Sequence, residues 1–330
     1  MEFNYDNDKS DFRQVLMDFP TQIDRANGLT EYIKVDQKVT KIAIIGMGGS
    51  ALPGLILQNY LKDEHFPVYV IRDFNVPNYI DKETLIFIIS YSGNTDETIA
   101  AYRKVVKHNA PIITMSAGGK LEQIASMYKS QYVRIPQVLQ PRLAIGYMFF
   151  AIINILVKAK IIQDRSEDTK ATIKALQKDV YEPFAKDLAN KIGDKTPLMY
   201  ASTDLSSITY LWKIGFNENA KSMAFANVVP ELDHNELAGY AGAKGQYYTI
   251  LFKDVTGDDP RIRKRIETLK ELIKESGNDA AEMAIRGENL MSKLFSAIFL
   301  GMWTTYYVAL ARGVDPAPVD IIESFKQKVK

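Results

Sequence analysis

The chain has 330 residues, of which 46% are hydrophobic and 25% charged, a composition typical of a folded globular protein. Its 41 Lys and Arg residues balance 40 Asp and Glu residues, which argues against a protein drawn to nucleic acid or acidic membranes by its overall charge. The absence of cysteine excludes disulfides, thiolate nucleophiles and cysteine-based metal sites. Residues 1–6 lack the apolar core of a signal peptide, and we expect a cytoplasmic protein.

The first half of the chain alternates strand and helix patterns. A helical lead-in over residues 1–30 carries apolar residues at Phe12, Val15, Leu16 and Phe19. The strands that follow are predicted at residues 41–45, 67–72, 84–89, 111–115 and 132–135, and the helices at 50–62, 95–108 and 119–127. Strands that alternate with helices in this way predict a doubly wound parallel sheet.

Two apolar segments resemble membrane spans. Residues 143–157 include only Asn154 as a strongly polar side chain, and residues 294–311 are similar in character. A transmembrane helix needs about 20 apolar residues, and a shorter run is more typical of a buried helix. We therefore interpret both segments as core or subunit-interface helices.

The charged stretch at residues 163–168 marks the predicted domain boundary, which we set between domains of residues 1–160 and 161–330. The second domain repeats the α/β alternation. Its helices are predicted at residues 167–190, 206–220, 258–276, 288–312 and 318–329, and its strands at 197–201, 247–252 and 281–285, with an irregular segment at 231–240.

Two strands of the first domain end in turns made of glycines and hydroxyl residues. The turns read Gly46-Met47-Gly48-Gly49-Ser50 and Ser90-Tyr91-Ser92-Gly93-Asn94-Thr95. A strand-to-helix turn leaves backbone N–H groups unpaired, and with the helix dipole they favour an anion such as phosphate. Both turns are expected at the carboxyl edge of one sheet, where α/β sheets bind ligands. The second domain has no such hydroxyl turn.

A second interpretation stays open for the first turn. Gly46, Gly48 and Ala51 satisfy the loose dinucleotide pattern, and Asp73, after the next predicted strand, could bind a ribose. This interpretation gives the second turn no role beyond capping a helix. A dinucleotide-binding dehydrogenase is therefore one alternative function.

The two turns resemble the sugar isomerase (SIS) domain, a phosphosugar-binding α/β module. Segments of the second half resemble signatures of the bifunctional phosphoglucose/phosphomannose isomerases of archaea and some bacteria: Gly215-Phe216-Asn217-Glu218-Asn219-Ala220-Lys221, Asp233-His234-Asn235-Glu236-Leu237 and Val319-Asp320-Ile321-Ile322-Glu323-Ser324-Phe325-Lys326. The likeness covers nearly the whole chain. It implies two SIS-type doubly wound domains, each a parallel sheet flanked by helices, and aldose–ketose isomerisation of hexose 6-phosphates.

The resemblance also implies roles for individual residues. Glu218 matches the base that moves a proton between C2 and C1 through a cis-enediol(ate), a task that suits a carboxylate. His234 matches the group that opens the sugar ring, and its neighbours Asp233, Asn235 and Glu236 could fix its tautomer. Arg142 matches a cation that stabilises the enediolate, and Lys326 a lysine that assists ring opening. The residues expected at the phosphate are Gly48, Gly49, Ser50, Ser90, Ser92 and Thr95.

In this family the histidine reaches the active site from the neighbouring subunit, so we expect a homodimer that acts on glucose, fructose and mannose 6-phosphates. We expect no cofactor and no metal, since proton transfer of this kind needs neither. Nucleic acid and membranes are not expected partners. A non-catalytic phosphosugar regulator stays an alternative, because it would keep the hydroxyl turns without needing Glu218 or His234. An isomerase or transferase of the glucosamine type would share the phosphate turns, but the matches at Glu218 and His234 argue against it.

Overall fold

The computed structural model describes residues 2–329 and contains two compact units. The first unit comprises residues 17–173, and the second comprises residues 2–16 together with 174–329. The predicted domains of residues 1–160 and 161–330 differ from these units at the start of the chain and at the boundary, and they stay a prediction about domain organisation.

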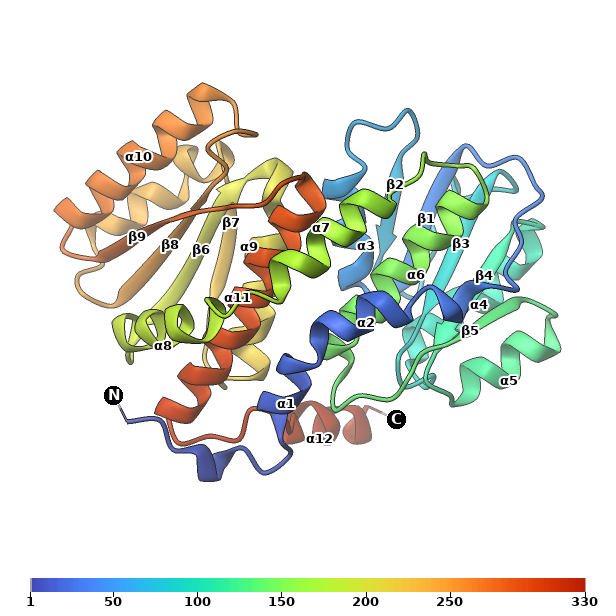
Figure 1. Cartoon of the computed structure of the whole chain (residues 1–330), viewed down its shortest axis with the longest axis horizontal. Coiled ribbons are helices and arrows are strands. Elements are labelled where there is room, and N and C mark those ends of the chain that lie inside the picture. Colours follow the sequence, from blue (N-terminus) through green and yellow to red (C-terminus); the bar gives the residue numbers. More distant parts are fainter. Residues whose placement is uncertain (1, 330) are drawn as a thin grey trace. The chain divides into compact units, whose positions relative to one another are not determined.

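The first unit contains a five-stranded sheet in which every adjacent pair is parallel, in the order β2-β1-β3-β4-β5 (Figure 1). Its strands are β1 (Lys41–Gly46), β2 (Val68–Ile71), β3 (Thr84–Ile89), β4 (Ile112–Ser116) and β5 (Gln131–Arg134). Its helices are α2 (Phe19–Arg25), α3 (Leu52–Tyr60), α4 (Asp96–Val105), α5 (Lys120–Met127) and α6 (Ile145–Lys158). The doubly wound parallel sheet expected from the alternation is confirmed.

Helices cover both faces of this sheet, which explains why its central strands are continuously apolar. On one face, Ile86 and Ile88 of β3 belong to the same buried cluster as Tyr102 of α4. On the other face, Gly54 of α3 lies so close to Ile44 that an added Cβ would come within 2.9 Å of its side chain. The sheet is therefore a rigid support for the turns at its edge.

The second unit contains a four-stranded parallel sheet in the order β7-β6-β8-β9. Its strands are β6 (Thr196–Ser202), β7 (Phe225–Val229), β8 (Tyr247–Lys253) and β9 (Asp279–Ala284). Its helices are α1 (Phe12–Met17), α8 (Tyr181–Ile192), α9 (Ser206–Glu218), α10 (Pro260–Glu275), α11 (Leu290–Ala311) and α12 (Asp320–Lys328), and α7 (Ser166–Leu176) spans the division between the units.

In the second half, one predicted helix was wrong and one strand was missed. The helix predicted over residues 167–190 is broken into α7 and α8. Pro183 in the first turn of α8 has no N–H, and its ring would clash with the carbonyl of a preceding helical turn, so one continuous helix is disfavoured. The edge strand β7 was not predicted at all.

The two long apolar segments are buried helices, as expected. Helix α6 has eleven of its residues buried, among them Phe149 and Phe150. Helix α11 is long and apolar enough to cross a membrane by length and composition, but 78% of its most apolar 18-residue window is buried inside the protein. The buried core helix of a soluble protein can be equally long and apolar. Helix α11 also packs against α9, where Trp212 donates a hydrogen bond to the carbonyl of Ala297 in α11 at 2.8 Å.

The first residues of the chain pack onto α8 and α11 within the second unit. Phe12 stacks on Tyr306 with ring centroids 5.8 Å apart, and Arg13 forms an ion pair with Glu182 at 2.8 Å. Burial opposes ionisation of Glu182, but hydrogen bonds from Arg13, Tyr307 and Lys186 outweigh it and lower the pKa of this carboxyl from 4.5 to about 2. The ionised carboxylate of Glu182 therefore stabilises the folded chain.

We expect Glu182→Gln to lower the free energy of unfolding at pH 7 by about 2 kcal/mol, the scale of a hydrogen bond to a charged group. A carboxyl with a lowered pKa stabilises the fold above its unfolded pKa near 4.5, and this contribution is lost as the pH falls through about 2. The difference between wild type and variant, measured by denaturant titration, should therefore shrink below pH 4.5. Asp187→Asn, which breaks the exposed pair with Lys191, is the control and should change stability by less than about 0.5 kcal/mol. A difference for Glu182→Gln that stayed constant down to pH 3 would contradict this account.

Candidate functional site

The two turns predicted to bind phosphate start side by side at the carboxyl edge of the first sheet. Strands β1 and β3 are parallel neighbours, and Gly46 at the end of β1 is in register with Ile89 at the end of β3. The turn after β1 continues as a short 3-10 helix, η3 (Gly48–Ser50), and the turn after β3 leads into α4. This juxtaposition is the one that the sequence predicted.

Hydrogen bonds join the turns to each other. The Ser50 hydroxyl accepts a bond from the backbone N–H of Tyr91 at 2.9 Å. Within the second turn, the hydroxyls of Ser90 and Thr95 lie 2.8 Å apart. Ser50 and Ser90 are almost completely buried, at 4% and 0% exposure, whereas Ser92 is exposed. The Ser50 hydroxyl therefore links the two turns and the Ser90 hydroxyl braces the second turn, while Ser92 faces solvent and can meet a ligand.

The second turn depends on a backbone shape that only glycine adopts easily. Gly93 has a φ of +69°, and an added Cβ would lie 1.8 Å from the carbonyl oxygen of Gly118. The side chain of Asn94 accepts a hydrogen bond from the N–H of Lys120 at 3.2 Å, which ties the turn to the start of α5. The turn is thus fixed before any ligand arrives.

Arg142 lies against the first turn. It belongs to the 3-10 helix η5 (Pro141–Leu143) and is only 4% exposed. A Cβ added to Gly49 would come within 2.7 Å of the backbone nitrogen of Arg142, so the two segments are in direct contact. The structure therefore brings a buried guanidinium-bearing residue and both hydroxyl turns together in one unit.

The predicted base, Glu218, lies in the second unit as the last residue of α9 and is half-buried. The segment that follows is held in place by amide side chains. Asn219 donates to the hydroxyl of Thr305 in α11 at 2.9 Å, and Asn217 donates to the carbonyl of Ser222 at 2.8 Å. Glu218 thus sits at a well-ordered helix end.

His234 is exposed at the end of the 3-10 helix η7 (Glu231–His234). Its imidazole makes no hydrogen bond within residues 2–329. The neighbours expected to fix its tautomer bind other groups instead: Asp233 pairs with Arg265 at 2.6 Å, and Asn235 donates to Glu231 at 2.9 Å. The imidazole therefore faces solvent, where a ligand or another chain can reach it.

Glu236, which is half-buried, has a structural role that the sequence did not reveal. Its carboxylate accepts hydrogen bonds from Tyr200 of β6 at 2.5 Å and from Asn227 of β7 at 2.6 Å. Burial, with Tyr240 and Glu236 nearby, raises the pKa of Tyr200 well above its ordinary value, so the phenol stays protonated and donates a hydrogen bond to the carboxylate. This network anchors the segment that carries His234 to the second sheet.

Lys326 lies on α12, a helix that buries none of its residues. Its ammonium group pairs with Glu323 at 2.7 Å, and both side chains are more than half exposed. Glu218, His234 and Lys326 are all in the second unit, whereas the hydroxyl turns and Arg142 are in the first.

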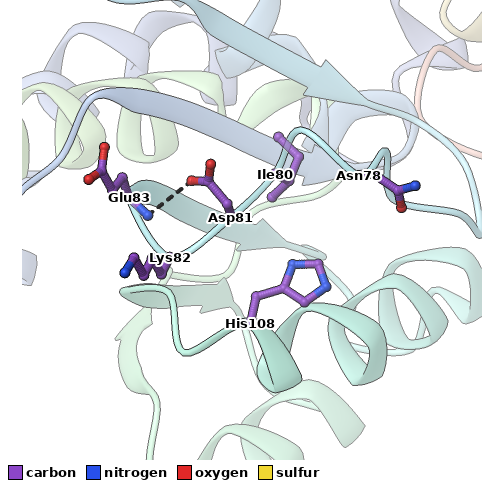
Figure 2. Close-up of a pocket in the computed structure, with 6 residues that line it drawn as sticks. All are labelled: Asn78, Ile80, Asp81, Lys82, Glu83 and His108. Atoms are coloured by element: carbon purple, nitrogen blue, oxygen red, sulfur yellow. Dashed lines mark hydrogen bonds between the residues drawn. The ribbon is translucent and has the colours of Figure 1, made fainter.

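One open hollow of about 630 Å³ lies at the opposite, amino end of β3 (Figure 2). It is lined by Asn78, Ile80, Asp81, Lys82, Glu83 and His108. Asp81 accepts the backbone N–H of Glu83 at 3.0 Å and pairs with Lys41 at 2.6 Å, so its charge is already neutralised. The hollow contains no residue predicted for the site.

Among residues 2–329, no group of three or more His, Asp or Glu side chains could hold a metal ion.

Comparison with known proteins identifies the family. The SIS domain model matches residues 36–127, and the model described as the bacterial phospho-glucose isomerase C-terminal SIS domain matches residues 182–329. A bifunctional phosphoglucose/phosphomannose isomerase from Caldicellulosiruptor bescii is 34% identical over 327 residues, which cover 94% of this chain and 96% of the relative. This chain belongs to the bifunctional phosphoglucose/phosphomannose isomerase family. A second member, from Thermoplasma volcanium, is 36% identical over 296 residues, 88% of this chain and 92% of the relative.

Membership of the bifunctional isomerase family confirms the resemblance noted in the sequence and favours the phosphosugar interpretation of the first turn over the dinucleotide one.

Solved structures support the fold. A hypothetical protein from Thermus thermophilus matches with a TM-score of 0.77 at 15% identity, covering 97% of this chain and 90% of that chain. The C-terminal domain of glucosamine-fructose-6-phosphate aminotransferase from Francisella tularensis matches with a TM-score of 0.71 at 17% identity, covering 95% and 99%.

We expect Gly93→Ala to lower the free energy of unfolding by about 3 kcal/mol or more, because the new Cβ meets a backbone carbonyl in a conformation that already disfavours alanine. Denaturant titration measures this loss. Gly28→Ala is the matched control, since nothing lies within 4 Å of its added Cβ. Equal stabilities of the two variants would show that the second turn is not held as described.

Proposed function

We propose that this chain interconverts glucose 6-phosphate and fructose 6-phosphate, and mannose 6-phosphate and fructose 6-phosphate. The observation that carries the proposal is the meeting of two hydroxyl turns at one sheet edge, with Arg142 packed against the first turn. The activity for which the relatives from Caldicellulosiruptor bescii and Thermoplasma volcanium are named supports it.

The phosphate group binds at the carboxyl edge of the first sheet. Exposed Gly48 and Ser92 and half-buried Thr95 offer backbone N–H groups and hydroxyls to its oxygens, and Gly49 continues the first turn. The buried hydroxyls of Ser50 and Ser90 complete the set of phosphate-site hydroxyls; Ser50 links the two turns, and Ser90 braces the second turn. The phosphate is bound equally in ground state and transition state, so these groups act on substrate affinity.

The reaction itself is a proton transfer. His234 and Lys326 move the proton between O5 and O1 that opens the sugar ring. Glu218 removes the proton from C2, the electrons of that bond form the C1–C2 double bond, and the C1 carbonyl pair moves to O1, which gives the enediolate. O1 takes up the proton that O2 gives up, the C2 carbonyl forms, and the electrons of the C1–C2 double bond take the proton from Glu218 back to C1. Arg142 stabilises the negative charge that develops on oxygen. No oxidant or reductant is consumed.

The working enzyme is a cytoplasmic homodimer in which His234 serves the active site of the partner. Two features support this part of the proposal: the exposed imidazole of His234 has no hydrogen-bond partner within residues 2–329, and α12 exposes Ile321, Phe325 and neighbouring apolar side chains.

Incubation of the protein with fructose 6-phosphate and a chelator should yield glucose and mannose 6-phosphates.

Ser92→Ala should raise KM about tenfold or more with little change in kcat, because a hydrogen bond to a charged group is lost in ground state and transition state alike. Glu218→Gln should lower kcat by about 100-fold or more, the contribution of a general base. Ser126→Ala and Glu275→Gln, an exposed serine and an exposed glutamate that also ends a helix, are the matched controls. Wild-type inactivity, or full activity of Glu218→Gln, would refute the proposal.

Subunit mixing tests the dimer separately. His234→Ala and Glu218→Gln should each be nearly inactive alone. If His234 acts in the partner's site, a refolded equal mixture should regain about a quarter of the wild-type activity, because half of the dimers are mixed and each has one intact site. No recovery in mixtures whose heterodimers are demonstrated would show that His234 acts within its own chain.

A second activity has a specific basis. A D-glucosamine-6-phosphate 4-epimerase from Sulfolobus acidocaldarius is 34% identical over 209 residues, 63% of this chain and 66% of that relative. The same assay should therefore include glucosamine 6-phosphate, with inversion at C4 as the readout. Turnover of this substrate without isomerisation of fructose 6-phosphate would favour epimerisation as the function.

A further inference from the structure

Tyr91, between the two serines of the second turn, connects three parts of the candidate site. Its backbone N–H donates to the hydroxyl of Ser50 in the first turn at 2.9 Å. Its phenol donates to the carbonyl of Val138 at 2.9 Å and accepts the N–H of Val138 at 2.5 Å. Val138 lies in the segment that leads from β5 to η5. One residue therefore joins the second turn, the first turn and the segment that carries Arg142.

The segment around Arg142 is held from two further sides. Gly49 packs against the backbone of Pro141 and Arg142. The buried amide of Gln22 in α2 donates to the carbonyl of Leu143 at 2.8 Å and accepts the N–H of Tyr147 at 3.4 Å. The backbone on each side of Arg142 is thus fixed, and Tyr91 is the contact that ties this segment to the second turn.

The phenol of Tyr91 is suited to a permanent link. Burial raises the pKa of Tyr91, so the hydroxyl stays protonated and can donate its hydrogen bond to the carbonyl of Val138. Tyr91 is only 9% exposed, and within residues 2–329 its hydroxyl has hydrogen-bond partners on Val138 alone. Replacing the tyrosine with phenylalanine keeps the ring and removes these two hydrogen bonds.

We infer that Tyr91 is a positioning residue that couples the phosphate turn to the placement of Arg142. This inference rests on the proposed function. The second turn is already fixed around Gly93 and Asn94, and the phenol of Tyr91 carries that fixed position to Val138 and the segment beyond it. Arg142, the cation that stabilises the enediolate, is thereby held in place relative to the phosphate site before the reaction starts.

The inference predicts a particular kinetic signature. Tyr91→Phe should lower kcat for fructose 6-phosphate about tenfold, because a small misplacement of a charge-stabilising group weakens transition-state binding, while KM changes less than about threefold. Inorganic phosphate should inhibit the variant competitively with an unchanged inhibition constant. Tyr102→Phe is the matched control, since it removes another buried phenol of the first unit, bonded to Ser130, and should leave kcat unchanged.

A double-mutant cycle separates positioning from general loss of structure. In an Arg142→Ala background, Tyr91→Phe should change kcat by less than about twofold, since a residue that acts through Arg142 has nothing left to position. An undiminished tenfold loss in that background, or a loss confined to KM, would overturn the inference. If Tyr91→Phe does not fold, Gln22→Met tests the same segment from its other side and should show the same dependence on Arg142. Inactivity of the wild-type enzyme would instead refute the proposed function, so the two failures are distinguishable.

Discussion

The parallel pairing of β1 with β3 is the constraint on which the candidate site depends. Because Gly46 is in register with Ile89, the chain leaves both strands at the same level of the sheet, and the Ser50 hydroxyl can reach the N–H of Tyr91. A shift of one residue in this pairing would turn the side chains of one strand to the opposite face and separate the turns. Close packing opposes such a shift, because Ile44 lies directly against Gly54 of α3 on one face and Ile88 belongs to the buried cluster of Tyr102 on the other. The packed core therefore fixes the geometry of a polar site.

The second sheet shows what the same architecture becomes without hydroxyl turns. Its central pair, β6 and β8, ends at Ser202 and just before Asp254, the positions that correspond to the phosphate turns by strand order. There Asp258 accepts the Ser202 hydroxyl at 2.6 Å, and Asp254 forms a buried ion pair with Lys293 at 2.8 Å. Buried carboxylates at this edge repel a phosphate, and the lysine that could attract one is already paired. The asymmetry expected from the sequence thus has a physical cause.

The features that the sequence revealed are those set by local pattern. Continuous apolar runs predicted the buried parallel strands, and small residues after β1 and β3 predicted the turns. The sequence did not reveal features that depend on distant partners. Strand β7 is a short edge strand in which only Val229 is buried. It therefore lacks the continuous apolar run that marks the central strands. The carboxylate of Glu236 binds Tyr200, 36 residues earlier in the chain, a pairing that only the folded sheet creates. The attachment of Phe12 to Tyr306 likewise joins opposite ends of the chain.

The proposed chemistry divides between rigid and exposed groups, and this division has a consequence for assembly. The hydroxyl turns and Arg142 are braced by buried hydrogen bonds and close backbone contacts, which suits groups that bind the phosphate and stabilise charge without reorganising. His234 and Lys326 are exposed and face solvent. Proton transfer through an enediolate needs water excluded from the reacting carbons, because solvent would otherwise protonate the intermediate and weaken every electrostatic interaction around it. Groups this exposed can meet that requirement only when another surface covers them, and so in the proposed mechanism a second subunit is part of the active site.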